Sequence, residues 1–259
     1  SLSLNTTGNY NVAIGQDSMA NTDGASDNVA IGRAAMVANT TGTMNVAVGA
    51  YAFDANQGGS ANTCIGFNAG TAFTSDGITA IGKDALESCT TGNNTAVGAN
   101  SLAAVTTGSQ NTAVGQDALQ ANTGGYNTAV GAYALIGNTT GGQNTAIGYN
   151  TLENNTTASF NTAVGSETLF TNTTGANNVA VGQAVLYQNT TGGQNTAMGN
   201  SALNKNTTAS YNSAFGNQAL EKNTTGAENT AVGHQALEAN TTGAYNTSVG
   251  KNSLKSLTA

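Results

Sequence analysis

The sequence predicts an all-β chain folded as a parallel β-solenoid, a narrow coil of stacked turns. First, the pentapeptide Asn-Thr/Val-Ala-Val/Ile-Gly recurs in fifteen near-copies, and its closing glycines are only ever 17 or 16 residues apart. Second, apolar residues keep the same place in every period, which a disordered low-complexity chain has no reason to do. Third, Pro is absent, which fits a backbone whose N–H groups are needed in sheet ladders. We therefore expect residues 1–259 to form one array of about fifteen coils with no internal domain boundary.

One period is numbered here from the Asn of its pentapeptide, as positions 1 to 5, and residues 161–177 show it whole. Ala-Leu is the commonest pair at positions 8 and 9, where this period has Thr168-Leu169, and Asn-Thr-Thr-Gly follows at positions 12 to 15. The 16-residue periods begin at Asn62, Ile78 and Asn111, and they lose their residue outside the pentapeptide. A turn tolerates such a slip, whereas inside a strand it would exchange the two faces. The pentapeptides are therefore the predicted strands.

Within each predicted strand, positions 2 and 4 share one face and position 3 takes the other. Position 4 is Ile, Val, Met or Phe throughout, and position 9 is Leu, Met or Phe in every period except at Gly70. We expect positions 4 and 9 to fill the inside of each coil and to stack into a continuous aliphatic column. The Gly at position 5 would let the chain turn with a positive φ.

The Ala row at position 3 would then point out of the coil. It is Ala in thirteen periods, with Cys64 and Ser248 as exceptions, although a solvated row would have drifted to polar residues. We interpret the row as a contact surface for further copies of the chain, and a threefold assembly is the simplest closed one. The reverse assignment, in which Ala lines a thin coil, stays open. The predicted interface residues are Ala13, Ala30, Ala47, Ala96, Ala113, Ala129, Ala146, Ala163, Ala180, Ala197, Ala214 and Ala231.

Two Asn rows, at positions 1 and 12, are predicted to set the corners of the coil. Asn tolerates left-handed backbone geometry, bonds its own backbone in turns, and stacks into hydrogen-bonded ladders when in register. Nine asparagines of the second row also begin Asn-Thr-Thr sequences that match the N-glycosylation pattern. These are Asn5, Asn39, Asn138, Asn155, Asn172, Asn189, Asn206, Asn223 and Asn240.

The composition argues against nucleic-acid binding and against a membrane-spanning segment. Six Lys and Arg residues against thirteen Asp and Glu, a net charge of −7, cannot form the cationic stripe that nucleic-acid binding needs. No apolar run approaches the roughly 18 residues that span a bilayer. We expect neither nucleic-acid binding nor a membrane-spanning segment.

The titratable residues do not form a predicted catalytic, cofactor or metal site. His234 is the only His, which argues against nucleophilic triads and His-based metal centres. Paired carboxylates could still cleave glycans, but no three acids share a register on adjacent coils. The acids concerned are Asp17, Asp84 and Asp117 in one register and Glu87 and Glu153 in another.

Cys64 takes the place of a position-3 Ala, and Cys89 takes the place of a position-12 Asn one period later. Because these positions are not equivalent, we expect two buried thiols that fill small sites. A disulfide between them stays open.

One row of aromatic residues suggests contact with a ligand. The residue that directly precedes the pentapeptide, here called the pre-strand row, is aromatic in five periods and polar in most others. Such side chains could stack on sugars, or they could cover the neighbouring coil. The five are Tyr10, Tyr126, Phe160, Tyr211 and Tyr245.

The sequence Asn-Val-Ala-Ile-Gly at 11–15 and 28–32, with its Asn-Thr-Ala-Val-Gly variants, resembles the head repeat of YadA-like trimeric autotransporter adhesins. The resemblance covers the whole chain, but only through this short motif, and the inserted Asn-Thr-Thr-Gly departs from the family pattern. It implies a left-handed parallel β-roll, a homotrimer, and binding of host or surface ligands outside the cell. The Asn-Thr-Thr-Gly arrays also resemble those of phage and virus tail-fibre proteins.

We therefore expect a segment of an extracellular, cell-surface or virion fibre that is structural and adhesive and is not an enzyme. Its expected partners are further copies of itself, as a trimer and through end-to-end joining of uncapped ladder edges, and a cell-surface or matrix ligand or glycan. A phage or virus tail-fibre shaft is the alternative. An ice-binding solenoid with ordered Thr rows and a glycan-processing enzyme are the remaining hypotheses.

Overall fold

The computed structural model describes residues 1–90 and 92–258 of the chain. Within these residues it holds fifteen parallel β-strands of three residues each and no helix. The prediction of an all-β parallel solenoid is therefore confirmed. The chain divides into two compact units, residues 1–126 and residues 127–259.

Each strand covers positions 2 to 4 of a pentapeptide. The strands of the first unit are β1 (Val12–Ile14), β2 (Val29–Ile31), β3 (Val46–Val48), β4 (Thr63–Ile65), β5 (Thr79–Ile81), β6 (Thr95–Val97) and β7 (Thr112–Val114). Those of the second unit are β8 (Thr128–Val130), β9 (Thr145–Ile147), β10 (Thr162–Val164), β11 (Val179–Val181), β12 (Thr196–Met198), β13 (Ser213–Phe215), β14 (Thr230–Val232) and β15 (Thr247–Val249).

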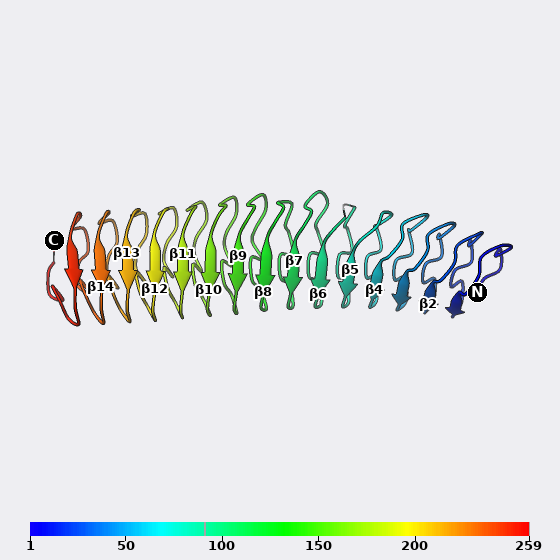
Figure 1. Cartoon of the computed structure of the whole chain (residues 1–259), viewed down its shortest axis with the longest axis horizontal. Coiled ribbons are helices and arrows are strands. Elements are labelled where there is room, and N and C mark those ends of the chain that lie inside the picture. The colour runs from blue at the N-terminus through cyan, green and yellow to red at the C-terminus, as the bar shows by residue number, and fades with distance from the viewer. Residues whose placement is uncertain (91, 259) are drawn as a thin grey trace. The chain divides into compact units, whose positions relative to one another are not determined.

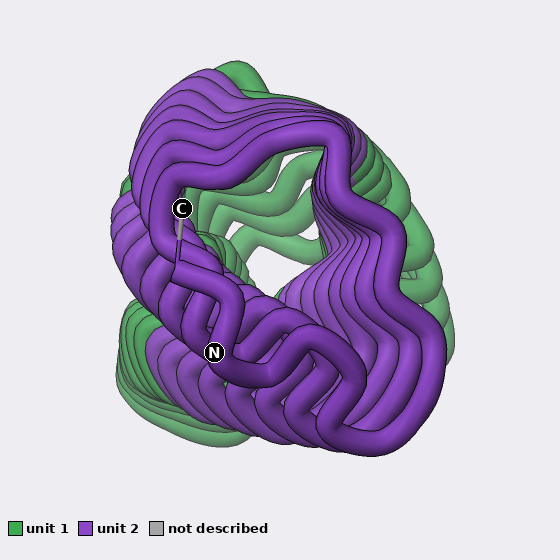
Figure 2. Tube along the Cα trace, turned by 90° about the vertical axis from the view of Figure 1, so that its left-hand side faces the viewer, with its two compact units in different colours: residues 1–126 green, residues 127–259 purple. Residues whose placement is uncertain are grey.

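Consecutive strands within a unit pair in parallel and in register, so equal positions of neighbouring coils lie side by side. In the first unit Ala13 pairs with Ala30, and in the second Ala163 pairs with Ala180. Figure 1 shows the strands of each unit following one another in chain order. Figure 2 shows the coils of the second unit (purple) repeating the same outline one behind another. Each sequence position therefore becomes a row that runs along the stack.

The inside of the coil is filled from positions 3, 8 and 9. Position-9 side chains such as Leu119 and Leu186 are fully buried, as predicted. Burying one Leu contributes about 1.5–3 kcal/mol relative to leaving it exposed. Position 4, by contrast, lies on the outside, where Ile14 is 58% exposed and Met198 47% exposed. The prediction that position 4 fills the core was wrong, because the Leu opposite already occupies the narrow interior and leaves room only for Ala.

Both Asn rows form buried hydrogen-bonded ladders, as predicted. At position 1, the Asn28 side-chain amide donates to the carbonyl of Gly42 at 2.9 Å, and its Oδ1 accepts the N–H of Asn45 at 3.0 Å. At position 12, Asn39 Oδ1 accepts from the N–H of Gly42 and from Asn56 Nδ2. These amides satisfy backbone groups that the corners would otherwise leave unpaired.

The Gly at position 5 has a φ between +120° and +140° in every coil, which confirms the expected turn. A Cβ at Gly49 would lie 2.3 Å from the carbonyl oxygen of Gly66 in the next coil. Position 9 also has a positive φ, for example 52° at Leu119, although L-residues rarely adopt it. Every coil therefore holds its position-9 residue in a left-handed backbone, which is strained for all of them except Gly70.

A group of exceptional residues in the first unit compensates for the one missing position-9 side chain. A Cβ at Gly70 would lie 2.6 Å from Cys64 Sγ and 3.1 Å from Ile78 Cδ1. Cys64 replaces an Ala and Ile78 an Asn, so two larger apolar groups take up the space of the absent Leu. Cys64 and Cys89 are both free and buried, as expected of thiols that fill small sites. Burial raises the pKa of the Cys64 thiol, and the nearby Cys89 raises it further.

Candidate functional site: the exposed rows of the coil

The described part of the chain contains no pocket and no cluster of three or more metal-ligating side chains. It also holds no helix with the length and apolar character that a bilayer crossing requires. The exposed rows of the coil are the candidate surfaces for contact with another molecule. Because the coils stack in register, each such row repeats one side chain at the strand spacing, about 4.8 Å.

The predicted Ala interface is not on the surface. From Ala30 to Ala231 its members are fully buried within a single chain, and Ala13 in the first strand is half-buried. The whole set behaves as the small lining of a thin coil, which was the alternative assignment. This correction applies to Ala13, Ala30, Ala47, Ala96, Ala113, Ala129, Ala146, Ala163, Ala180, Ala197, Ala214 and Ala231.

Positions 2 and 4 of the strands instead form an outward surface, here called the outer strand face. Position 2 is Thr, Val or Ser213, and position 4 is always a large apolar residue, so none of the thirty side chains carries a charge. Many of them are substantially exposed, such as Val249 at 67% and Val179 at 39%. The alternation of the pentapeptide predicted a face of this composition but assigned it to the inside.

The pre-strand row is also on the surface, as its aromatic members suggested. Tyr10 is 86% exposed, Tyr245 77%, and Tyr126, Phe160 and Tyr211 are each more than half exposed. Their backbones all have a φ near +60°, from 58° at Tyr10 to 64° at Tyr211. With so much of each ring in solvent, these aromatics do not serve mainly to cover the neighbouring coil.

The Asn-Thr-Thr asparagines are placed where a glycan cannot be attached to the folded coil. Eight of the nine are fully buried, and Asn5 is half-buried. The side-chain nitrogen of Asn172, for example, donates to Asn155 Oδ1 at 3.0 Å and to the Gly175 carbonyl at 2.9 Å. A sugar on this nitrogen would replace one of its two hydrogens, so at least one of these bonds would be lost, and the buried corner would have to open.

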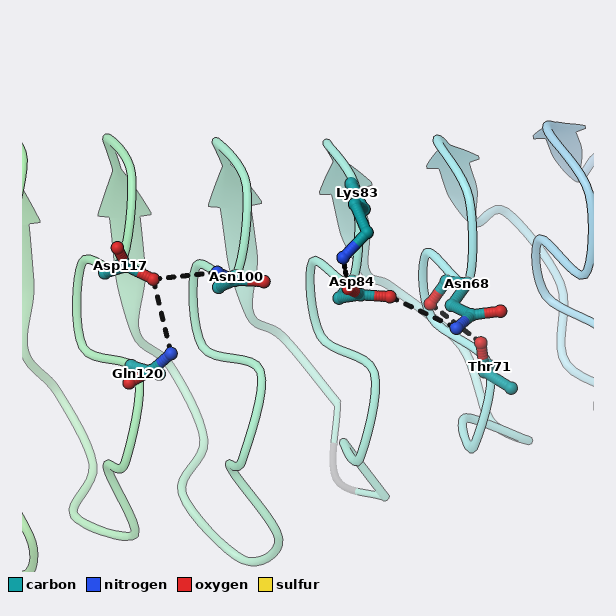
Figure 3. Close-up of polar contacts among 7 residues, drawn as sticks. All are labelled: Asn68, Thr71, Lys83, Asp84, Asn100, Asp117 and Gln120. Atoms are coloured by element: carbon teal, nitrogen blue, oxygen red, sulfur yellow. Dashed lines mark hydrogen bonds and ion pairs between the residues drawn. The ribbon is translucent and has the colours of Figure 1, made fainter.

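The acids in the register of position 7 alternate with amides and do not converge. Asn68 Nδ2 donates to Asp84 Oδ1 at 3.1 Å, and Lys83 forms an ion pair with Asp84 at 2.5 Å (Figure 3). Two coils away, Asp117 accepts hydrogen bonds from Asn100 and Gln120 (Figure 3). Each carboxylate is held by its own donors, an arrangement typical of a stabilising side-chain ladder.

Glu153, Asp17 and His234 belong to other coils than Asp84 and Asp117. Burial raises the pKa of the Glu153 carboxyl, and the neighbouring charge of Glu167 raises it further. Asp17 and His234 are exposed on separate coils.

Two exposed features were not identified from the sequence. One is the second Thr of Asn-Thr-Thr, at position 14, which is exposed in all seven coils of the second unit that contain it. The sequence shows that this position is Thr in each of these coils, but it does not distinguish the exposed second Thr of the pair from the first. The other is an aromatic pair that recurs in both units, Tyr51 with Phe67 and Tyr133 with Tyr149, each with ring centroids 6.1 Å apart.

No protein-family model, curated protein or solved structure matches this chain.

Proposed function

We propose that the chain is a structural and adhesive fibre segment that acts outside the cell, at a cell surface or on a virion. In this proposal the stacked coils form a stiff scaffold, the outer strand face joins copies of the chain, and other rows remain free to contact a ligand. The observation that carries the proposal is the outer strand face, which is exposed in the single chain yet has no charge at any of its thirty positions.

The composition of this face is unusual for a surface that stays in water. In the second unit it extends from β8 to β15, about 34 Å at the strand spacing of about 4.8 Å. Its position-4 row is apolar in every coil, and an apolar row of this length on the outside of a protein generally marks an interaction surface. The acids that give the net charge of −7 lie outside the face, so copies can approach it without placing like charges opposite each other.

A second copy of the same chain is the occupant that fits best. Every coil presents an uncharged Thr, Val or Ser beside an apolar Ile, Val, Met or Phe, so coils of one chain can match coils of another in register. Parallel copies related by rotation form a closed assembly, and three is the number implied by the resemblance to YadA-like heads. The same assembly would suit a phage or virus fibre shaft.

Sedimentation equilibrium of the purified chain tests this assembly. We expect a mass three times that of the chain, and a monomer after Val164→Lys with Val232→Lys. Both side chains already contact solvent, so Lys can keep its stem on the sheet with its charge in water and leave the coil folded. Circular dichroism of the monomer should match that of the wild type.

The matched control is Thr174→Lys with Thr225→Lys, which adds the same charge to exposed position-14 sites of the same unit. We expect this variant to remain trimeric. A wild-type monomer at high concentration, or equal dissociation by both pairs of substitutions, would show that the outer strand face does not join copies of the chain.

A further inference from the structure

The pre-strand row of the second unit consists of Gln143, Phe160, Asn177, Gln194, Tyr211, Glu228 and Tyr245, and all seven are exposed. Each has a positive φ, between 57° and 64°. In six of them the backbone N–H is bonded to a carbonyl of the preceding coil, as in Tyr211 to Gly193 at 3.2 Å. The row is therefore a series of exposed side chains on a hydrogen-bonded backbone, repeated at about the strand spacing.

Aromatic residues have an unfavourable backbone conformation at these positions. A bulky residue at a positive φ is an outlier, whereas Asn and Gly adopt this geometry readily. Phe160, Tyr211 and Tyr245 gain little burial in return, because they are 54%, 58% and 77% exposed. The ring-to-ring contacts found in this unit, Tyr133 with Tyr149 and Phe170 with Tyr187, involve other residues. Packing within the chain does not account for these three rings.

The spacing of the rings suits an extended polymer better than a small ligand. Phe160 and Tyr211 are three coils apart, and Tyr211 and Tyr245 are two coils apart. At about 4.8 Å per coil, these separations are about 14 Å and 10 Å, and the three rings span about 24 Å. A single sugar can meet only one ring, whereas a chain that lies along the stack can meet all three.

The side chains between and beside the rings are suited to hydroxyl groups. Gln143, Asn177 and Gln194 each offer a donor and an acceptor. Three residues before each member of the row is an exposed position-14 Thr, which backbone reach places within about 10 Å. In six of the seven coils this Thr hydroxyl makes no hydrogen bond within the described chain. These are Thr140, Thr157, Thr174, Thr191, Thr208 and Thr225.

The preceding Thr, at position 13, is different. Thr156 Oγ1, for instance, donates to the carbonyl of Thr173 in the next coil at 3.0 Å. The first Thr of each pair therefore has a structural role that the second lacks. An exposed row that stays Thr in every coil, beside rows that vary, indicates a role outside the chain.

The charge of the chain indicates which class of polysaccharide the pre-strand row could bind. Glu228 is the one charged member of the pre-strand row in the second unit, and its charge is negative. The whole chain has only six Lys and Arg residues. Uronic-acid and sulfated polymers would be repelled by the net charge of −7 and would find no cationic row. A neutral polymer meets neither obstacle.

We infer that the pre-strand row of the second unit, with the position-14 threonines beside it, binds an extended neutral polysaccharide laid along the stack of coils. This inference rests on the proposed adhesive function and names its ligand class. The rings stack on the apolar faces of the sugar units, and the amides and hydroxyls bond to sugar hydroxyls. Affinity accumulates over several weak contacts, so long chains bind and short oligosaccharides bind poorly.

Affinity electrophoresis of the full chain in gels that contain hydroxyethyl cellulose, galactomannan, dextran or alginate tests the inference. We expect at least one neutral polymer to retard the wild type and alginate not to. The triple variant Phe160→Asn, Tyr211→Asn, Tyr245→Asn should bind that polymer at least about 10-fold more weakly, because three stacking contacts are lost. Since Asn177 already occupies this row, the variant should melt at or above the wild-type temperature.

The matched control is Tyr149→Asn, which removes a ring that is 52% exposed on a different row of the same unit. It should bind as the wild type does. The inference fails if no neutral polymer binds, if the triple variant is retarded normally, or if it melts early, which would give the rings a packing role. Sedimentation distinguishes a failure of this inference from a failure of the proposed assembly. A trimer that binds no polysaccharide would contradict only the proposed ligand. A monomer that binds polysaccharide would contradict only the proposed trimer.

Discussion

Gly49 occupies a site where a single added carbon would collide with the next coil. Its φ is +138°, and a Cβ would lie 2.3 Å from the Gly66 carbonyl oxygen. We expect Gly49→Ala to destabilise the chain by about 2–4 kcal/mol, through backbone strain and overpacking together. Urea unfolding followed by circular dichroism measures the change.

The control for this substitution is Gly58→Ala in the same unit. There the nearest atom to an added Cβ is Thr41 Oγ1 at 3.3 Å, the end of a side chain that can rotate. We expect a midpoint close to that of the wild type. Equal losses for the two variants would mean that the close approach of position-5 glycines does not limit the fold.

Asn177 and Asn178 are neighbours in sequence with opposite environments. Asn178 is fully buried, donates to the Gly192 carbonyl at 2.9 Å and accepts the Asn195 N–H at 3.0 Å. Asn178→Ala leaves the Asn195 N–H buried and unpaired, whereas the Gly192 carbonyl keeps its hydrogen bond from Asn189 Nδ2, so the substitution should cost about 1–3 kcal/mol. Exposed Asn177→Ala should cost no more than about 1 kcal/mol, the difference in left-handed backbone preference. Thermal melts that rank the two variants in the reverse order would contradict the ladder.

Position 4 is a residue whose orientation the sequence does not predict. A period of two assigns residues to two faces but does not say which face is inside. Residue size predicts that the larger side chains, those of position 4, fill the core. The coil is too thin for two large side chains opposite each other, so Leu119 is buried and Val114 is exposed. That thinness depends on how the turns close, which no single pentapeptide encodes.

Among the turn elements, the last three coils are joined by an ion-pair cluster on Glu238. Lys222 Nζ lies 3.2 Å and Lys255 Nζ 3.3 Å from its carboxylate oxygens. Burial by itself would raise the pKa of Glu238, but the hydrogen bonds and charges of the two lysines outweigh it and lower the pKa below its usual value. The folded state therefore holds this carboxylate ionised more strongly than the unfolded state does.

It follows that the stabilisation from Glu238 is complete above the unfolded-state pKa and is lost as pH falls through the folded-state value. Glu238→Gln should lose less than about 1 kcal/mol at pH 7, since both lysines are largely solvated. It should also reduce the acid sensitivity of unfolding. The exposed Glu228→Gln is the control, and melts between pH 3 and 7 that fall in parallel for wild type and Glu238→Gln would contradict this assignment.

The turn elements also divide into those that the sequence predicts and those that it does not. The Asn corners and the position-5 turn follow from residue preferences, and the structure confirms both. The compensation around Gly70 does not follow, because Cys64 and Ile78 come from other segments and meet it only in the folded coil. Long-range compensation of this kind requires coordinates.

For the molecule as a whole, the period alone predicts the architecture. Fifteen equal segments, each too small to bury its own apolar face, are stable only when stacked on neighbours. The candidate site is less predictable. The sequence predicts exposed aromatic residues in the pre-strand row, and these lie on the surface. It also predicts a contact between copies at Ala113 and its equivalents, but these residues line the interior.

The direction of the hydrogen bonds has a mechanical consequence. The bonds between coils run along the stack, so a load applied to the two ends of the chain pulls on one coil-to-coil junction at a time. Each 17-residue coil that detaches replaces about 4.8 Å of stack with about 56–61 Å of extended chain. Single-molecule stretching should therefore give a series of small equal steps, whereas one large rupture per unit would contradict this. A tether made of such coils lengthens under load and dissipates force before it breaks.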